Sequence, residues 1–471
     1  MASLGNEGRV ASDEPDRVAV AAAVTSLLKD GKARTAREIA ASLAHLPGLT
    51  DVTKGNVNSV LYSELARNVR RDSEFRWFIP VTSVRAIPAA VETKAMHSDR
   101  GSLLRAVQRL RSGTPPSENV RRLTVGSERI GRAIGRWLTP GAPSRWLLIS
   151  GDYGEGKTHS LTLIRDLAHS VGYATCQLNA DASSSALNHP QRFLPVKLGT
   201  LELPGTPVSG YEDLLYRILS DRATVPAAAR AVEKYLGTGR SADMGAQWAI
   251  EHILGMNQNQ FGSDEHLRAI RAATFHLTGD STRYRPGTPA TRAGAYALLQ
   301  VALHLIMQQG ARGLVLLLDE VESVFTKLWN ARSRFGAYRV MAALGHGEDF
   351  PDMKVAFAVT PDAEKCIREE LDLNASTIDA LSNEPIEAFH SSLATRFADI
   401  RCHGLRIEER EQLANRTKSL YDAAYPDSNI SSEVWTAFSN EICAQSIPVR
   451  QLVRLVVDFL DTQRYGSRSV R

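Results

Sequence analysis

Four short runs rich in apolar residues stand out along the chain. Between them, apolar residues mostly recur three or four positions apart, as in amphipathic helices. The four runs lie at residues 146–150, 172–181, 313–320 and 354–362. Such runs are typical of strands that are buried on both faces of a parallel sheet. Because amphipathic helical stretches separate them, the pattern predicts an α/β fold with a parallel sheet at its core.

A long segment, residues 182–309, separates the second expected strand from the third. Helical patterns fill much of it, at residues 211–219, 227–236, 265–277 and 293–308. A compact core of this class needs much less chain between two strands, so we interpret the segment as a helical elaboration. A lid, a partner-binding surface and a DNA-facing arm remain alternative uses for it.

The N-terminal residues have the pattern of a small domain of their own. Thr35 and Glu38 have the spacing of a capping box that opens a second helix, and a third helix is expected over residues 54–66. Two short alternating segments around a polar turn follow. Three helices and a β-hairpin in this order predict a winged helix-turn-helix. The expected domains are this winged helix-turn-helix at 1–80, a linker at 81–102, the sheet-containing core at 103–405 and a C-terminal helical lid at 406–471.

A glycine-rich phosphate-binding loop follows the first strand. Residues 151–158 read GDYGEGKT, and an amphipathic run begins at once. Glycines let the backbone turn tightly and point its N–H groups at phosphate oxygens, and the helix N-terminus adds its dipole. Lys157 places a positive charge near the β and γ phosphates of a nucleotide such as ATP, and Thr158 offers a hydroxyl to Mg²⁺. The predicted nucleotide-binding residues are Gly151, Asp152, Tyr153, Gly154, Glu155, Gly156, Lys157, Thr158 and His159.

A second motif, GLVLLLDE, ends the third strand with carboxylates. Asp319 lies at the carboxyl end of the strand, where open α/β sheets bind their ligands, and it can hold Mg²⁺ together with Thr158. Glu320 is the candidate base that orients or deprotonates the attacking water. A solvated carboxylate or a helix cap is the simpler interpretation of Glu320, and Glu322 is a weaker alternative base.

Further residues have a functional and a structural interpretation each. Thr360 ends the fourth strand, where it could report the γ-phosphate as sensor 1 does in AAA+ ATPases, or form a turn. Arg396 could stabilise transition-state charge on a neighbouring subunit's nucleotide, or lie on the surface. Arg450, with Arg454 as second choice, has the position of the sensor 2 arginine in AAA+ lids, or is a solvated helix charge. Gly126 is assigned to a loop on the adenine side.

The third helix of the N-terminal domain would lie in a major groove if the domain binds DNA. Its outward residues are Lys54, Asn56, Asn58, Ser59, Tyr62 and Ser63. The hairpin adds Arg70, Arg71 and Arg76, which suit phosphate contacts, whereas Trp77 is expected in the core. Docking to a protein partner is the alternative. The net charge of +4 permits contact with nucleic acid without demonstrating it.

Composition narrows the class of protein further. At 471 residues two or three domains are expected, and a hydrophobic content of 43% is enough for their cores. The four cysteines are far apart and form no CxxC pair, which indicates reduced thiols instead of a disulfide framework or a zinc site. No apolar run approaches the roughly 18 residues of a membrane span, and the N-terminus has no signal-peptide core. We therefore expect a cytoplasmic protein without a membrane partner.

Several segments resemble one family of bacterial proteins. The stretches LLISGDYGEGKTHSL, SALNHPQRF, LVLLLDEVESVF and IPVRQLVRLVVDFLD, with RLRSGTPPSENVRRLTVG before the core, resemble the BREX phage-defence P-loop ATPases of the BrxD type. The resemblance is piecewise and covers roughly residues 103–463. It implies an AAA+/STAND-like ATPase encoded beside a helicase or other defence proteins. By motif match it implies that Lys157, Thr158, Asp319 and Glu320 are nucleotide-site residues.

Together these features predict an AAA+-like P-loop protein that binds and hydrolyses ATP with Mg²⁺. Hydrolysis is expected to drive a conformational or assembly change on DNA. Three classes stay open. The first is a DNA-associated motor or loader in phage defence, and the second is a slow, nucleotide-gated switch that recruits effectors. The third is a DNA-binding regulator that uses ATP only as a ligand. Other defence-system proteins and a homo-oligomer are compatible with each class.

Overall fold

The computed structural model describes most residues of the chain. They are residues 17–28, 34–62, 65, 70–71, 76–78, 100–139, 141–142, 144–179, 187–206, 208–236, 244–278, 292–328, 330–346, 350–373, 389, 400–428 and 430–466. The chain divides into two units, Met1–Ala86 and Ile87–Arg471, each with apolar clusters of its own. The expected linker lies outside the described residues up to residue 99, and its last residues open a helix.

The first unit contains three helices and a short antiparallel ladder. They are α1 (Arg17–Leu28), α2 (Ala36–Leu43), α3 (Lys54–Tyr62), β1 (Arg70–Arg71) and β2 (Trp77–Phe78). The expected capping box is present at α2, because the Glu38 N–H donates to Thr35 Oγ1 over 3.2 Å and the Thr35 N–H donates to Glu38 Oε2 over 2.7 Å. Trp77 is 7% exposed and packs in the core, as predicted. The order of elements matches the expected one, and the identity of a winged helix-turn-helix stays a prediction.

The second unit is built on a six-stranded sheet in the order β5-β4-β6-β7-β3-β8. Its strands are β3 (Trp146–Gly151), β4 (Ala174–Asn179), β5 (Leu201–Glu202), β6 (Leu314–Asp319), β7 (Met353–Val359) and β8 (Ile400–Cys402). Neighbours pair in parallel except β5, which is antiparallel to β4. The predicted strands correspond to β3, β4, β6 and β7, so the α/β class and the parallel sheet are confirmed.

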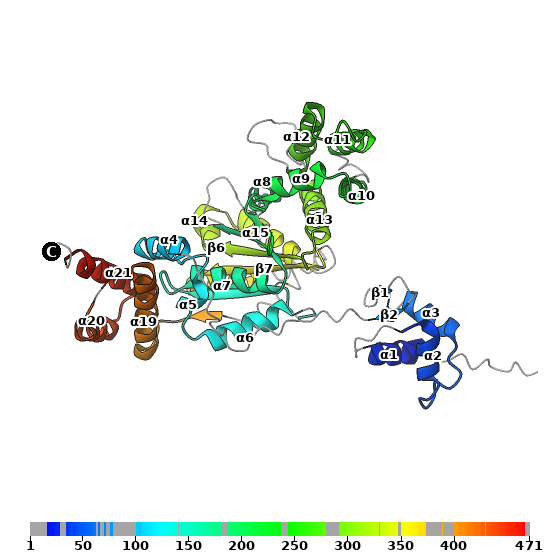
Figure 1. The fold of residues 1–471 in the computed structure, drawn as a ribbon. Helices are drawn as coiled ribbons and strands as arrows, with labels where there is room; N and C mark the ends of the chain where they lie inside the picture. The colour runs from blue at the N-terminus through cyan, green and yellow to red at the C-terminus, as the bar shows by residue number, and fades with distance from the viewer. Residues whose placement is uncertain are drawn as a thin grey trace, which may run out of the picture. The chain divides into compact units, whose positions relative to one another are not determined.

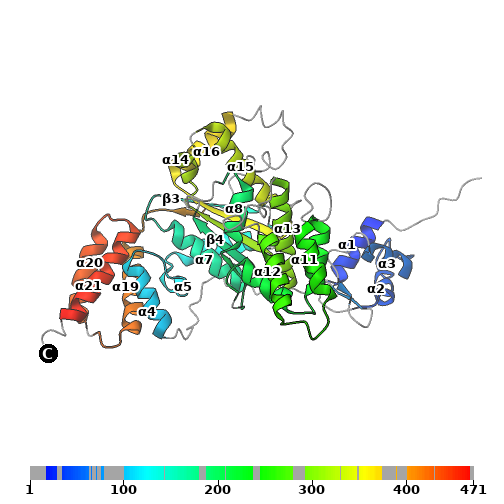
Figure 2. The same ribbon diagram turned by 90° about the horizontal axis from the view of Figure 1, so that it is seen from above.

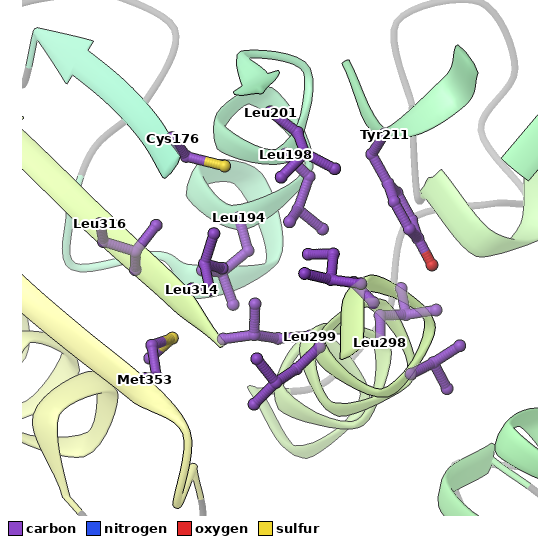
Figure 3. Packing of buried hydrophobic residues seen from close by; sticks show 14 of the residues in the cluster. Cys176, Leu194, Leu198, Leu201, Tyr211, Leu298, Leu299, Leu314, Leu316 and Met353 are labelled. Atoms are coloured by element: carbon purple, nitrogen blue, oxygen red, sulfur yellow. The ribbon is translucent and has the colours of Figure 1, made fainter. Parts of the chain in front are cut away.

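Successive residues of a strand point to opposite faces of the sheet. Because β3, β6 and β7 are buried at every position, both faces are covered by helices. One face carries α5 (Val120–Leu123), α6 (Ser127–Leu138) and α7 (Lys157–Ser170). The other carries α8 (Pro190–Leu198), α13 (Arg292–Gln308), α15 (Ala331–Gly345) and α16 (Pro361–Leu373). In β6, Val315 and Leu317 pack in the first layer. Leu314 and Leu316 pack in the second layer, beside Leu194 and Met353 (Figure 3). The resulting three layers hold the strand ends in fixed positions.

The elaboration predicted between the second and third strands is a group of helices. Besides α8 and α13 it contains α9 (Tyr211–Ser220), α10 (Val225–Leu236), α11 (Met244–Gly255) and α12 (Asp264–Thr278). The sequence predicted α9, α10, α12 and α13 but missed the short helix α8 and the longer α11. The segment MGAQWAIEHILG carries apolar residues on more than one side of the helix, with Trp248 78% exposed, so it has no single apolar face to recognise.

The C-terminal helices form the expected helical end of the chain. They are α19 (Ile407–Ala424), α20 (Ser432–Ala444) and α21 (Val449–Gly466), and we call them the lid. The helix α4 (Arg100–Arg111), which the sequence assigned to the core domain, packs against α19 and α21 and shares their apolar cluster. Arg111 Nε also donates to Asp461 Oδ2 of α21 over 2.8 Å. The lid and the group α9–α13 lie at opposite ends of the second unit, with the sheet between them in both views (Figure 1, Figure 2).

Two predictions about the class of protein concern membranes and disulfides. Among the described residues, no helix has both the length and the apolar character that a membrane span requires. None of the four cysteines, all of which lie in the described part of the chain, takes part in a disulfide.

Thr35→Ala should destabilise the first unit because the Glu38 amide loses its acceptor. We expect the free energy of unfolding of a fragment of residues 1–86 to fall by about 1 kcal/mol, which is the usual effect of removing such a cap. Trp77 is the one tryptophan of that fragment and reports its unfolding by fluorescence in a urea titration. Thr35→Ser keeps the hydroxyl and is the control, so an equal loss in both variants would contradict the role of the cap.

Candidate functional site

The loop between β3 and α7 has the geometry of a phosphate cradle. Gly154 and Gly156 have φ values of +83° and +97°, in the left-handed region that favours glycine. A Cβ on Gly151 would lie 2.7 Å from the Cβ of Cys402 on the neighbouring strand β8. The helix α7 begins at Lys157, and its first amide groups have no partner within the helix. The loop therefore needs its glycines, and it presents amide groups to an anion.

Lys157 is buried under this loop, with 6% of its surface exposed. Its Nζ donates to the backbone oxygens of Gly151 over 2.8 Å and of Asp152 over 3.3 Å. The same atom lies 4.9 Å from the centre of the Tyr153 ring and 3.9 Å from Glu322 Oε1. Its positive charge thus lies where the loop would meet phosphate oxygens.

Two segments that are far apart in the sequence meet at the carboxyl ends of the strands. Thr158 Oγ1 donates to Asp319 Oδ2 over 2.7 Å, and the Glu320 N–H donates to Asp319 Oδ1 over 3.0 Å. Asp319 is 3% exposed. A hydroxyl and a carboxylate are the hard oxygen ligands that Mg²⁺ prefers, so this pair fits the ion.

The two glutamates after Asp319 have different environments. Glu320 lines the cleft described below and has a φ of +55°, the one positive value among the described residues other than glycine. Strained backbone of this kind clusters at functional sites. Glu322 is 8% exposed, and burial raises its pKa while the charge of Lys157 opposes that rise. Neither carboxylate oxygen of Glu322 accepts a hydrogen bond from another described residue.

His159 links the helix α7 to the segment that precedes the sheet. Its Nε2 lies 2.9 Å from Thr124 Oγ1, and the Thr124 hydroxyl donates to the backbone oxygen of Val120 over 2.8 Å. The histidine must therefore be the donor to Thr124. Burial lowers the pKa of His159 to about 4, so the ring is neutral at neutral pH. Arg416 of the lid donates to the backbone oxygen of the same threonine, which joins the lid to the turn between α5 and α6.

The lid also contacts the phosphate loop directly. The Arg450 N–H donates to the backbone oxygen of Gly154 over 3.1 Å, and Arg450 Nε donates to that of Gly113 over 2.9 Å. A Cβ on Gly154 would lie 3.2 Å from Pro448 Cβ. Arg450, the first choice for the lid arginine, thus lies at the phosphate loop. The side chain of Arg454, the second choice, packs beside Gly113.

A cleft of about 1070 Å³ opens between the loop and the lid. Lys157, Thr158, Asp319 and Glu320 line its polar part, and Gly126, with a φ of +65°, lines it at the start of α6. This volume is slightly above the usual range for small-molecule sites, which combine an apolar lining with a few polar groups. The apolar part is lined by Leu110, Leu123, Val125, Ile130, Leu413 and Val453.

One catalytic candidate from the sequence, Thr360, is not brought into this cleft. Thr360 follows β7, which pairs with β6 as expected, but Thr360 is absent from the lining. Its Oγ1 accepts from the Ala363 N–H over 3.4 Å at the start of α16, which is the contact of a structural turn. Arg396 lies outside the described residues.

The candidate DNA contacts of the first unit occupy α3 and the ladder. Lys54 is exposed at the start of α3. Asn56 Oδ1 accepts from the Thr53 N–H over 2.9 Å, so this side chain takes part in the helix cap. Ser59 Oγ accepts from Arg17 Nη2 over 2.5 Å. Arg70 and Arg71 form β1, Arg76 precedes β2, Tyr62 ends α3, and Ser63 lies outside the described residues.

Sequence reasoning missed the arginines of α19 that organise the lid around the loop. Arg410 is 8% exposed and donates to the backbone oxygens of Leu405 over 3.1 Å and Ile447 over 2.8 Å. Burial raises the pKa of Glu155 in the loop, and Arg410 opposes that rise. An arginine in an amphipathic helix normally indicates a solvated charge, so the sequence held no signal for Arg410 or Arg416.

The chain matches one family model, whereas no curated protein and no solved structure gives a significant match. The model describes the BREX system ATP-binding protein BrxC/D and matches residues 101–190 and 289–465. These residues include the phosphate loop, Asp319 and the lid, and they leave out the first unit and most of the elaboration. In the described part of the chain, no cluster of three or more His, Cys, Asp and Glu residues could hold a metal ion. The chain belongs to the BREX system ATP-binding protein BrxC/D family.

Proposed function

We propose that the protein binds ATP with Mg²⁺ in the cleft between the phosphate loop and the lid, and hydrolyses it. One observation carries the proposal: Thr158 is hydrogen-bonded to Asp319 beside the buried charge of Lys157. A phosphate-binding cation, two Mg²⁺ ligands and a carboxylate base are then available in one cleft. The family of BREX ATP-binding proteins supports ATP as the nucleotide.

Each residue would have a defined part in this reaction. Lys157 and the loop amides would hold the β and γ phosphates. Thr158 and Asp319 would hold Mg²⁺, directly or through water, and the bound ion neutralises phosphate charge. Glu320 would accept a proton from the attacking water, or orient it.

We further propose an AAA+-like mechanism in which the lid follows the state of the nucleotide. In support, β7 lies between the strand of the phosphate loop and the strand of Asp319. The Arg450 backbone is bonded to Gly154, so a shift of the loop would move the first turn of α21. The contacts of Thr360 favour its structural interpretation, and a role for Arg396 in a neighbouring subunit stays a prediction from the sequence.

Membership of the family suggests a role in BREX phage defence. We propose that the protein acts on or near DNA through its first unit, with other defence proteins or further copies of the chain as partners. The positive charges of Lys54, Arg70, Arg71 and Arg76 support this proposal. A slow nucleotide-gated switch is the second candidate, favoured by the direct contact between lid and loop, and a regulator that only binds ATP is the third.

Glu320→Gln should leave ATP binding intact and slow hydrolysis, because an amide does not accept a proton from water. We expect phosphate release at saturating ATP to fall by more than about tenfold, which corresponds to 1.4 kcal/mol of barrier. Glu408→Gln removes an exposed carboxylate of α19 outside the cleft and is the control. A smaller reduction in Glu320→Gln would place the base elsewhere, with Glu322 the next residue to test.

Removing residues 1–86 should abolish stimulation by DNA while basal turnover remains, because the second unit contains the whole cleft. We expect duplex DNA to raise phosphate release by the full chain and to leave that of the truncated chain unchanged. Fluorescence anisotropy at two salt concentrations should also show weaker DNA binding and a shallower salt dependence after truncation, because fewer phosphates are neutralised.

The same measurements separate the remaining classes. Equal DNA affinity and equal salt dependence before and after truncation would place DNA contact in the second unit. Slow turnover of the full chain without any response to DNA would favour the switch. No turnover at all would favour the regulator.

A further inference from the structure

A pair of opposite charges is buried beneath the phosphate loop. Lys157 is 6% exposed and Glu322 is 8% exposed, and Lys157 Nζ lies 3.9 Å from Glu322 Oε1. This distance brings the charges together but is too long for a hydrogen bond. Neither oxygen of Glu322 accepts a hydrogen bond from another described residue, although buried polar atoms nearly always have a partner. The glutamate therefore forms an ion pair with the lysine but no hydrogen bond to it.

The other contacts of the lysine explain why a counter-charge is needed there. An ammonium group has three donors, and two of them go to the backbone oxygens of Gly151 and Asp152. Carbonyl oxygens satisfy hydrogen bonds but carry no net charge. A buried cation without an opposite charge is strongly destabilising, and Glu322 faces the ammonium at salt-bridge distance.

We propose that Glu322 is the counter-charge that holds Lys157 in the nucleotide-free cleft, and that phosphate oxygens take its place when nucleotide binds. The proposal rests on the proposed nucleotide site and adds a positioning residue to it. Glu322 acts through Lys157 and sets how tightly the cleft holds nucleotide.

The direction of this effect follows from the charges. We expect bound phosphates to draw Lys157 away from Glu322, and nucleotide binding brings negative phosphates towards a buried carboxylate. Both changes oppose binding while Glu322 carries its charge. Replacing the carboxylate with an amide of the same shape removes both, so it should favour the bound state. A general base at this position would predict otherwise, because its loss slows the chemical step without tightening nucleotide binding.

The test compares Glu322→Gln with Glu364→Gln in the full chain. Glu364 of α16 is a buried carboxylate outside the cleft, 2.8 Å from Arg368, and controls for the general loss of a buried charge. A fluorescent ADP analogue is titrated without Mg²⁺, so that the affinity reports the phosphates and not the ion. We expect Glu322→Gln to bind the analogue about tenfold more tightly than the wild type, and Glu364→Gln to bind it as the wild type does.

Thermal unfolding gives a second readout that a merely structural role would not produce. Without nucleotide, Glu322→Gln should unfold at a lower temperature than the wild type, because Lys157 has lost its counter-charge. Saturating ADP should raise its unfolding temperature by more than it raises that of the wild type, because tighter binding stabilises the folded state more. A structural role would lower the unfolding temperature equally with and without ADP.

Glu322→Asp keeps the charge but withdraws it by one methylene, and it tests the proposal even if the glutamine variant does not fold. Its affinity for the ADP analogue should lie above that of the wild type and below that of Glu322→Gln. Unchanged or weaker binding in both variants would overturn the role of Glu322. A wild-type chain that binds neither the analogue nor ATP would instead overturn the proposed nucleotide site itself.

Discussion

The candidate site depends on the parallel pairing of β3, β7 and β6. Thr158 and Asp319 are separated by 161 positions in the chain, yet their side chains meet over 2.7 Å because the strands before them end at one edge. A shift of β6 by one residue would turn Asp319 to the other face of the sheet, because side chains alternate along a strand. The apolar layers on both faces resist such a shift. The chemistry proposed for the cleft is therefore a consequence of how Leu314–Asp319 packs.

The second constraint is the contact between the phosphate loop and the lid. The helix α4 precedes the sheet in the sequence but packs with the lid, and the segment after it supplies Gly113 and Thr124, which accept from the lid arginines. The cleft thus lies between two bodies, the sheet with its phosphate loop and the lid with α4. They are joined at the phosphate loop by Arg450 and at Thr124 by Arg416. The family match covers both bodies, whereas the first unit and most of the elaboration fall outside it. The family match therefore supports ATP binding in the part of the chain that contains the cleft.

The sequence predicted the parts of the fold that have a strong local signal. The buried strands, the capping box at Thr35 and the glycine-rich loop each follow from a short pattern of residues. The helix α11 was missed because its apolar residues do not form one face. The contacts of Arg416 with Thr124 and of Glu322 with Lys157 depend on tertiary packing, and no local pattern contains them. At Thr360 a local pattern was misleading. Its place at the end of a strand is typical of a sensor, but its side chain accepts from the Ala363 N–H at the start of α16.

The central claim is that the loop around Lys157 is an ATP site. Isothermal titration calorimetry of the full chain with ATP and Mg²⁺, compared with Lys157→Ala, tests it most directly. We expect one site per chain in the wild type and a large loss of affinity in the variant, because the substitution removes the charge that would face the phosphates. Binding of equal affinity in both proteins, or no binding of ATP by the wild type, would contradict it.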